Sequence, residues 1–455
     1  MTERILIGEL GSHVGETVTI KGWVHVRRDQ GKMVFFDFRD RSGIVQGVVL
    51  PGKEEALTVA KETRTDYAVA VTGIVNKRPE RNVQADKQNG DIELEVESIQ
   101  ILSEAQEMPF DREADDLTID TRFDYRPFTL RSQRDRDIFT VQATILKAFR
   151  GALDGRGFTE FQAPVLVGGD AEGGSAVFEI PDYYGKRAFL ATSGQLYKQI
   201  MVGPFERVMT IAKTFRAEKS ATTRHLAELT QLEFEMGFVE SHTEVMQVLE
   251  EVVREISTSV AETHPDILSR FNVAPALLPE GSFPVFRLSE AQEIIEREFG
   301  GKAVGEPDLE PEHERQICEY AKRELGSDFV FITHFPNKKR AFYTYADPEN
   351  PESTLSFDLL FRGLEINSGS KRIHDYEELV TKMQSRGMDP EKFSFYLQAF
   401  KYGLPPHGGC STGLERITMK MLDLQNVKEA SSFPRDMNRI DTLLSATEHS
   451  AAGSE

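Results

Sequence analysis

The chain has 455 residues, of which 39% are hydrophobic and 28% charged, and it carries a formal net charge of −20. Its length exceeds what one hydrophobic core usually supports, which predicts two or three domains. No apolar run reaches the roughly 18 residues that a membrane span needs, and we expect no signal peptide at the N-terminus. Two cysteines, Cys318 and Cys410, are too few for a disulfide framework or a four-ligand zinc site and favour a reducing cytoplasm. The acidity argues against general polyanion binding, so a nucleic-acid partner requires a local basic surface.

Residues 1–105 are predicted to form a domain of five short strands without a convincing helix. Runs rich in β-branched and aromatic residues, separated by Gly, Pro, Asn and Asp, occupy 18–26, 34–38, 44–50, 67–75 and 92–99. Five such strands suit a small closed barrel of the oligonucleotide-binding (OB) type. Basic residues surround Phe35 and Phe36, and a basic surface with an aromatic side chain for stacking is typical of base recognition on these barrels. The alternative is that both phenylalanines belong to the core.

Residues 106–130 are polar and show no sustained period, which indicates a linker or hinge. The remaining chain, 131–455, mixes helical and strand patterns and is predicted to be an α+β domain. Apolar residues recur at helical spacing from Ile138 to Leu153. A mainly helical insertion is expected around 241–325, where the apolar stripe serves packing and no chemistry is evident.

The segment 356–374, SFDLLFRGLEINSGSKRIH, combines several groups that suit a ligand site. It begins with the alternation of a strand, and Asp358 and Glu365 place two carboxylates where a divalent cation bound to phosphate oxygens can sit. Arg372 offers a planar fork for a substrate carboxylate, and the backbone between these residues is permissive. These groups predict a site for a phosphorylated cofactor and an acidic small molecule. A solvated strand–turn with a surface ion pair is the alternative.

Three further stretches carry charged groups in patterns that suit nucleotide binding. In 190–201, Gln195 and Lys198 lie one turn apart on a predicted helix. A strand–loop–strand hairpin, 207–236, clusters Arg216, Glu218, Arg224 and His225, as a polyphosphate requires. The glycine-rich turn PPHGGCSTGLER, 405–416, enters a helix whose N-terminus favours anions, with Arg416 in its first turn.

Three sequence motifs in this order resemble those of the class II aminoacyl-tRNA synthetases: GFTEFQAPVL (157–166), FRAE with RHL (215–226) and GLER (413–416). A barrel before the catalytic domain is similar to subclass IIb, the aspartate, asparagine and lysine enzymes. GQLYKQ (194–199), LEINSGSKRIH (364–374), KYGLPPHGG (401–409) and SFPRD (432–436) resemble the aspartyl-tRNA synthetases of the archaeal and eukaryotic branch. The resemblance implies an OB-fold anticodon-binding domain followed by a class II catalytic domain, an antiparallel sheet flanked by helices.

The resemblance also implies roles in ATP binding and chemistry. Arg216 would hold the α-phosphate and the aspartate carboxylate, and Arg416 the γ-phosphate; with Glu365 they form the implied catalytic set. The other implied ATP-binding positions are Glu218, Arg224, His225, Leu226, Gly413, Leu414 and Glu415. Magnesium would be held by Glu365 with Ser368 and Asp358.

For aspartate, Lys198 and Arg372 would clamp the side-chain carboxylate, with Gln195 beside them. Glu233 would bind the ammonium group. Glu172 would lie in a loop that closes over the substrate, and Arg216 and Ser368 complete this set. On the barrel, Phe35 matches the family's stacking residue, and Arg28, Gln46 and Glu93 match anticodon-reading positions. A cytoplasmic homodimer that charges tRNA(Asp) through an aspartyl-adenylate is implied; whether tRNA(Asn) is charged as well stays open.

Two alternatives remain. An asparaginyl-tRNA synthetase is the nearest, but an amide substrate gives no reason for two cations, Lys198 and Arg372, in the side-chain pocket, and burying them without counter-charge is costly. A catalytically inactive tRNA-binding paralogue is the second. It predicts loss of Arg216, Glu365 or Arg416, and all three are present. Leu229 stands where the family usually places an aromatic residue on adenine.

Overall fold

The computed structural model describes residues 3–440 apart from 86, 112, 115, 170–175 and 220–221. The chain forms two compact units, Met1–Asp111 and Arg112–Glu455. Two short helices, α2 (Ile119–Asp124) and α3 (Arg126–Thr129), lie in the range expected to be a linker. No helix in the described parts of the chain combines the length and apolarity of a membrane span.

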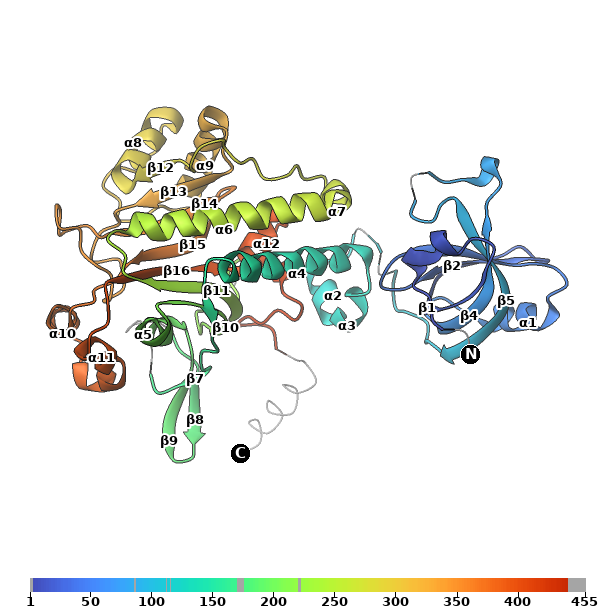
Figure 1. Ribbon diagram of the computed structural model, residues 1–455, viewed down its shortest axis with the longest axis horizontal. Helices are drawn as coiled ribbons and strands as arrows, with labels where there is room; N and C mark the ends of the chain where they lie inside the picture. Colours follow the sequence, from blue (N-terminus) through green and yellow to red (C-terminus); the bar gives the residue numbers. More distant parts are fainter. Residues whose placement is uncertain are drawn as a thin grey trace, which may run out of the picture. The chain divides into compact units, whose positions relative to one another are not determined.

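The first unit is a closed five-stranded barrel, which confirms the predicted OB-type fold (Figure 1). Its strands follow each other around the barrel as β1, β2, β3, β5 and β4, with bounds Thr17–Asp29, Val34–Arg39, Ile44–Val49, Ile92–Ser103 and Ala68–Lys77. A short 3₁₀ helix, Ile7–His13, precedes them. The expectation of no helix is wrong, because α1 (Glu54–Glu62) follows β3. Its buried Ala56 and Ala60 are four residues apart and so share one helix face toward the barrel.

Alternation along β2 separates the interior of the barrel from its outer surface. Phe36 and Phe38 are fully buried and stack with ring centroids 5.0 Å apart, whereas Phe35 points to the other face and is half-buried. The open choice between core and binding roles is therefore resolved differently for the two neighbours. Phe36 is a core residue, and Phe35 is available on the outside.

The second unit is built on an eight-stranded sheet of order β12-β13-β14-β15-β16-β11-β10-β6. All neighbours are antiparallel except β12 with β13 and β10 with β6. In chain order these strands are β6 (Thr159–Glu160), β10 (Arg207–Phe215), β11 (Glu228–Gly237), β12 (Val285–Arg287), β13 (Phe329–Thr333), β14 (Ser356–Phe361), β15 (Leu364–Lys371) and β16 (His407–Gly413). A small separate sheet contains β7 (Leu166–Val167), β9 (Lys186–Leu190) and β8 (Glu179–Tyr183).

Helices cover one face of the large sheet. Figure 1 shows α4 (Gln133–Asp154) and α6 (His242–Thr263) side by side across it, and their apolar residues form one core with the strands. The other helices are α5 (Gln195–Phe205), α7 (Pro265–Arg270), α8 (Leu288–Phe299), α9 (Pro311–Leu325), α10 (Tyr376–Ser385), α11 (Ser394–Lys401) and α12 (Leu414–Met421). The range 241–325 therefore holds four helices, of which α6 and α7 contribute residues to the main core.

The central strands divide their side chains between this core and a polar surface. In β11, Leu232, Phe234 and Met236 join the core, so the intervening Glu233 and Glu235 point to the opposite face. In the register of the sheet, Glu233 lies opposite Ser411 and Glu235 opposite Gly409 on β16. The polar face of β11, β15 and β16 thus gathers carboxylates and hydroxyls in one place.

A buried ion cluster fixes the start of α4. Asp135 is fully buried, and its carboxylate accepts hydrogen bonds from Arg122 and Arg126, each at 3.0 Å. Arg126 also donates to the backbone oxygens of Ser431 and Ser432. The cluster therefore ties α2, α3 and α4 to a segment three hundred residues later in the chain.

Candidate active site

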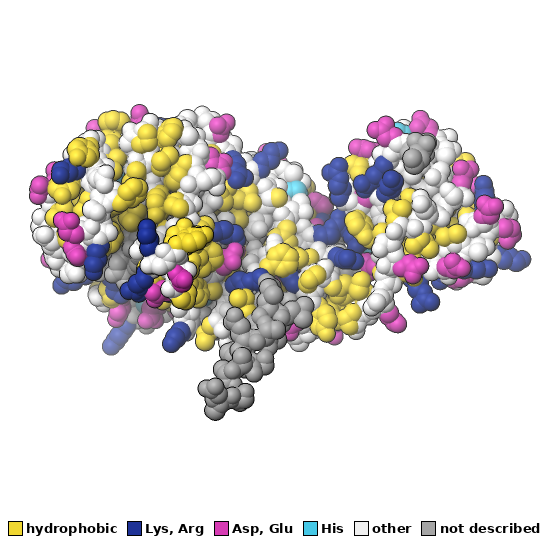
Figure 2. Space-filling model, turned by 90° about the horizontal axis from the view of Figure 1, so that it is seen from below, with side chains coloured by type: hydrophobic (Ala, Val, Ile, Leu, Met, Phe, Trp, Pro, Cys, Tyr) yellow, Lys and Arg dark blue, Asp and Glu magenta, His cyan; other side chains and the backbone are white. Residues whose placement is uncertain are grey.

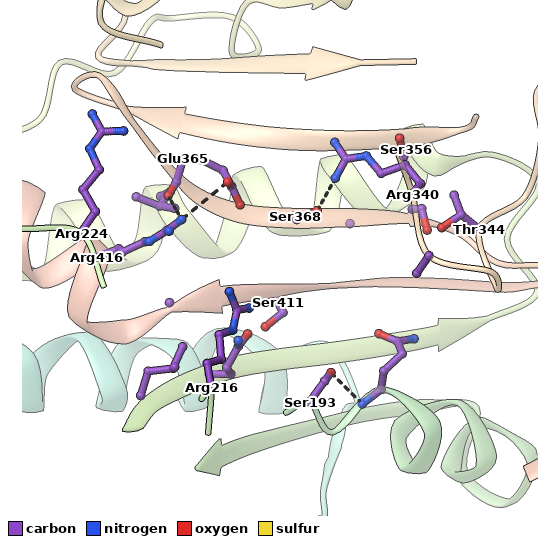
Figure 3. Close-up of a pocket in the computed structure, with 18 of the residues that line it drawn as sticks. Ser193, Arg216, Arg224, Arg340, Thr344, Ser356, Glu365, Ser368, Ser411 and Arg416 are labelled. Atoms are coloured by element: carbon purple, nitrogen blue, oxygen red, sulfur yellow. Dashed lines mark hydrogen bonds and ion pairs between the residues drawn. The ribbon is translucent and has the colours of Figure 1, made fainter. Parts of the chain in front are cut away.

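A cavity of about 350 Å³ lies over the polar face of the sheet (Figure 3). The predicted site residues that line it are Gln195, Arg216, Arg224, His225, Leu226, Glu365, Ser368, Arg372, Gly413, Glu415 and Arg416. They come from α5, the β10–β11 hairpin, β15 with the residue that follows it, and the β16–α12 junction. The tertiary structure thus brings together four stretches that the sequence keeps far apart.

Cations dominate one end of the cavity. Arg216, Arg224 and Arg416 line it, and Figure 3 shows Arg416 reaching Glu365. Arg416 donates through Nη1 to the Glu365 backbone oxygen at 2.8 Å, and the same Nη1 lies 3.6 Å from Glu365 Oε2. Burial lowers the pKa of His225, so its imidazole is neutral near pH 7 and leaves the positive charge to the three arginines. This end is suited to a chain of phosphates.

The predicted metal-binding groups lie near one another on β14 and β15. Asp358 is paired in register with Ser368, and Glu365 stands close enough to Asp358 for their charges to interact. Burial and then the Asp358 carboxylate raise the pKa of Glu365 to about 7. Asp358 Oδ1 is buried without a hydrogen-bond partner. A divalent cation would stabilise ionised Glu365 and give Asp358 Oδ1 a partner, so this donor set fits magnesium. The described residues contain no cluster of three acidic, His or Cys side chains that could hold a metal alone.

Arg340, which no sequence pattern indicated, also contacts the predicted metal-binding residues. Its Nη2 donates to Asp358 Oδ2 at 2.7 Å and its Nη1 to Ser368 Oγ at 2.9 Å, as Figure 3 shows for Ser368. The guanidinium stacks over Phe335, 3.8 Å from the ring centroid. Arg340 lies in an irregular stretch between β13 and β14, where no periodic pattern draws attention to a single arginine.

The other end of the cavity is floored by buried ion pairs. Arg372 donates through Nε to Glu235 Oε1 at 2.8 Å. Lys198 lies beneath the cavity, with Nζ 3.3 Å from Glu233 Oε2 and 3.5 Å from Glu235 Oε2. Gln195 Oε1 accepts a hydrogen bond from Arg372 Nη2 at 3.3 Å, so α5 contacts Arg372 through this side chain.

The expectation that two uncompensated cations favour aspartate over asparagine is wrong. Lys198 and Arg372 do have counter-charges, because Glu233 and Glu235 stand beside them on β11. Burial alone would raise the pKa of Glu235, but the charges of Arg372 and Lys198 lower it overall, so it is ionised. The number of cations in the pocket therefore does not select an acidic substrate. Glu235 follows Glu233 at a spacing of two in one strand, so both side chains lie on the same face, and this spacing is the signal that identifies Glu235.

Some predicted residues do not line the cavity. Lys198, Glu233 and Leu414 are buried beneath it, Asp358 is held by Arg340, and Glu218 lies 3.8 Å from both Arg216 and His225. Glu415 does line the cavity, but it is buried and accepts the Thr230 backbone N–H with both carboxylate oxygens. Glu172 lies outside the described residues. The sequence reasoning missed other lining residues, among them Ser193, Lys339, Tyr343 and Ser411.

On the barrel, the four predicted anticodon residues come from four adjacent strands of its outer face. Arg28 on β1 is opposite Phe35 on β2 and donates two hydrogen bonds to Asp37, at 2.9 and 2.8 Å. Gln46 on β3 is opposite Asp37 and contacts Glu93 on β5 at 3.5 Å. This outer face offers a ring for stacking beside donors and acceptors for base edges.

Comparison with known proteins places these features in a family. The family model described as tRNA synthetases class II (D, K and N) matches residues 118–437, and an OB-fold nucleic acid binding domain matches 18–102. The chain is 42% identical to the aspartate–tRNA(Asp/Asn) ligase of Thermus thermophilus, over 96% of this chain and 99% of the relative. It is 39% identical to the enzyme of the same name from Deinococcus radiodurans, over 96% and 98%.

A solved structure agrees with the family match. Asparaginyl-tRNA synthetase from Pyrococcus horikoshii, complexed with asparaginyl-adenylate, superposes with a TM-score of 0.86 at 30% identity, covering 97% of this chain and all of the other. Such a match over both units confirms the predicted order of an OB barrel before a class II catalytic fold. The chain belongs to the class II aminoacyl-tRNA synthetases of the aspartate, lysine and asparagine group.

Proposed function

We propose that this enzyme activates L-aspartate with ATP and transfers it to tRNA(Asp). The observation that carries the proposal is the 42% identity, over almost the whole of both chains, to a ligase named for aspartate. The cavity supports it, because one end gathers the guanidinium groups that bind phosphates and the other places Arg372 in the wall. The match to an asparaginyl enzyme keeps asparagine as the second candidate.

At the phosphate end of the cavity, the arginines neutralise the negative charge of the ATP phosphates. Arg216 would bridge the α-phosphate and the amino-acid carboxylate, while Arg224 and Arg416 hold the outer phosphates. The α-carboxylate oxygen then attacks the α-phosphorus in line, and the bond to the leaving pyrophosphate breaks. Because the protein forms no covalent bond, positioning and electrostatic stabilisation provide the rate enhancement. The terminal ribose hydroxyl of the tRNA next attacks the adenylate carbonyl and releases AMP.

At the amino-acid end, the ion pairs preorganise the recognition groups. Arg372 is held by Glu235 and by Ser370, whose Oγ accepts from Nη1 at 2.6 Å. A substrate carboxylate would approach the cavity side of this guanidinium. Both carboxylate oxygens of Glu233 are buried and accept no hydrogen bond, and Oε2 lies 3.3 Å from Lys198 Nζ; this carboxylate suits a role beside the substrate ammonium.

Glu365, Asp358 and Ser368 are the residues that would hold Mg²⁺. The ion would shield the phosphate charges as pyrophosphate leaves. Ionised Glu365 is disfavoured by burial and by Asp358, so we expect this carboxylate to bind a cation readily.

On the barrel, we propose that Phe35 stacks on an anticodon base while Arg28, Gln46 and Glu93 read base edges. Charging of tRNA(Asn) in addition to tRNA(Asp) is part of the proposal, because both relatives at 42% and 39% identity carry Asp/Asn in their names. A cytoplasmic homodimer completes it. Figure 2 shows apolar side chains gathered where the β8–β9 hairpin faces the viewer, and the exposed residues Leu166, Phe178, Tyr183 and Tyr184 of this region provide a surface for a second copy.

Aminoacylation separates these possibilities. The purified chain is incubated with ATP, Mg²⁺, labelled aspartate or asparagine, and separate tRNA(Asp) and tRNA(Asn) transcripts. Aspartate on both tRNAs is the expected result, and aspartate on tRNA(Asp) alone would restrict the specificity. Asparagine as the accepted substrate, or no charging of either tRNA, would overturn the proposal.

A further inference from the structure

Helix α9 carries an acidic residue on its buried face. His313, Ile317, Cys318 and Ala321 form the side that packs inward, and Glu314 lies among them with only 9% of its surface exposed. A carboxylate on an otherwise largely apolar stripe is costly unless a partner compensates it. The sequence of the insertion around 241–325 indicated no chemistry at this residue. The acid therefore requires its own explanation.

The partner of Glu314 is a residue of the cavity wall. Arg224 Nη1 donates to Glu314 Oε2 at 2.9 Å, and both side chains are mostly buried. Burial raises the pKa of Glu314, while Arg224 and a hydrogen bond from the Glu365 backbone N–H offset part of that rise. Glu314 thus contacts the β10–β11 hairpin on one side and β15 on the other. It therefore links Arg224 to the backbone of Glu365, and both of these residues line the same end of the cavity.

The helix itself is held firmly against the sheet at this point. The turn between β14 and β15 contains Gly363, which has a φ of +79° and adjoins Arg315 so closely that a Cβ there would lie 2.9 Å from Arg315 Cγ. Arg224 Nη2 also donates to the Gly363 backbone oxygen at 3.4 Å. Figure 3 shows Arg224 extending toward this turn. Arg224 is consequently fixed from two sides, by a helix and by a strand turn.

We propose that Glu314 is a positioning residue for phosphate binding, through which helix α9 holds Arg224 in the orientation that ATP requires. The inference rests on the proposed function, which places the ATP phosphates at this end of the cavity. A flexible arginine on a hairpin loses rotamer freedom when it binds a ligand. Glu314 removes that freedom before ATP arrives. The helical insertion therefore takes part in nucleotide binding through Arg224, without touching the nucleotide.

Binding of a non-hydrolysable ATP analogue with Mg²⁺, measured by calorimetry on the full chain without amino acid, tests this role. Glu314→Ala is expected to raise the Kd at least about tenfold, since small misplacements of a binding group have large effects. Glu314→Gln keeps an acceptor for Arg224 and should recover part of the loss; it also serves if the alanine variant does not fold. Glu319→Ala, an exposed acid on the same helix, is the matched control and should bind like the wild type.

A double-variant comparison distinguishes positioning from general destabilisation. In an Arg224→Ala background, Glu314→Ala should weaken analogue binding by less than about twofold, because the group it orients is absent. An equal loss in both backgrounds, or wild-type affinity in Glu314→Ala, would overturn the inference. In either case the wild-type chain still binds ATP and charges tRNA, so the proposed function stands. Failure of the wild type to bind the analogue would overturn the proposed function and this inference together.

Discussion

Arg372 and Glu235 form a forked ion pair in the floor of the cavity, with Nε 2.8 Å from Oε1 and Nη2 3.3 Å from Oε2. Both side chains are almost wholly withdrawn from water. Such a pair adds little net stability over an apolar packing, but it fixes geometry and is costly to break from one side. Its presence explains how a guanidinium can be kept in one orientation before the substrate binds.

Arg372→Leu is expected to abolish aspartate-dependent pyrophosphate exchange while binding of an ATP analogue survives. The arginine lies at the opposite end of the cavity from Arg416, so the phosphate groups keep their partners. Glu235 keeps Lys198 as its counter-charge in this variant, so we expect the chain to fold. Circular dichroism checks this. Lys401→Leu on an exposed helix end is the control. Aspartate activation by the Arg372 variant would refute the assigned role.

Gly409→Ala should disturb the same ion pair from the backbone side. A Cβ at this position would lie 2.2 Å from Glu235 Oε2 and 2.3 Å from the Phe234 backbone oxygen. Overpacking of this kind typically destabilises by about 1–3 kcal/mol. We expect a lower urea midpoint and a raised KM for aspartate. Gly281→Ala, which meets nothing within 4 Å, should leave both unchanged, and an unaltered midpoint in Gly409→Ala would contradict the structure.

Asp135→Ala is expected to destabilise the catalytic unit strongly. The substitution leaves Arg122 and Arg126 buried without their common counter-charge, and breaking a buried pair typically costs about 3–5 kcal/mol. Urea denaturation, monitored by far-UV circular dichroism, measures the loss in the free energy of unfolding. Asp154→Ala, at the exposed end of the same helix, should remain within about 0.5 kcal/mol of the wild type. Equal midpoints for the two variants would show that the cluster is dispensable.

The raised pKa of Glu365 makes the stability of the chain depend on pH. The folded state binds this proton up to about pH 7, whereas the ordinary pKa of glutamate is 4.5, so between these values the folded chain holds more protons than the unfolded one. The stability contribution of this residue therefore falls as pH rises from 4.5 to about 7. Without metal, Glu365→Gln should stabilise the chain at pH 8 and have little effect at the acidic limit. A stabilisation that grows toward low pH would contradict this sign.

The same titration affects metal binding. A cation binds the ionised carboxylate, so we expect Mn²⁺, a spectroscopic substitute for Mg²⁺, to bind more tightly as pH rises through about 7. Electron paramagnetic resonance of free Mn²⁺ at several pH values measures this directly. Glu365→Gln should weaken Mn²⁺ binding and flatten the profile. A pH-independent affinity in the wild type would argue against this carboxylate as a ligand.

Local patterns in the sequence determined a large part of the fold. Runs of β-branched and aromatic residues between turn-forming residues identified the five barrel strands, because such side chains pack well on a pleated surface. The charges at Arg216, Arg224 and Arg416 indicated phosphate binding because guanidinium groups suit phosphate oxygens. The helix α1 was missed because its short apolar face, Ala56 and Ala60, gives a weak periodic signal.

Tertiary structure decided how those charges are used. Whether Lys198 and Arg372 are free to bind an acidic substrate depends on Glu233 and Glu235, which approach them only when α5, β11 and the end of β15 pack together. Arg340 lies in an irregular stretch, and Glu314 lies in the insertion around 241–325, where the sequence indicated no chemistry. Their partners, Asp358 and Arg224, come from other elements, and such contacts arise from the sheet order, which no local period in the chain encodes.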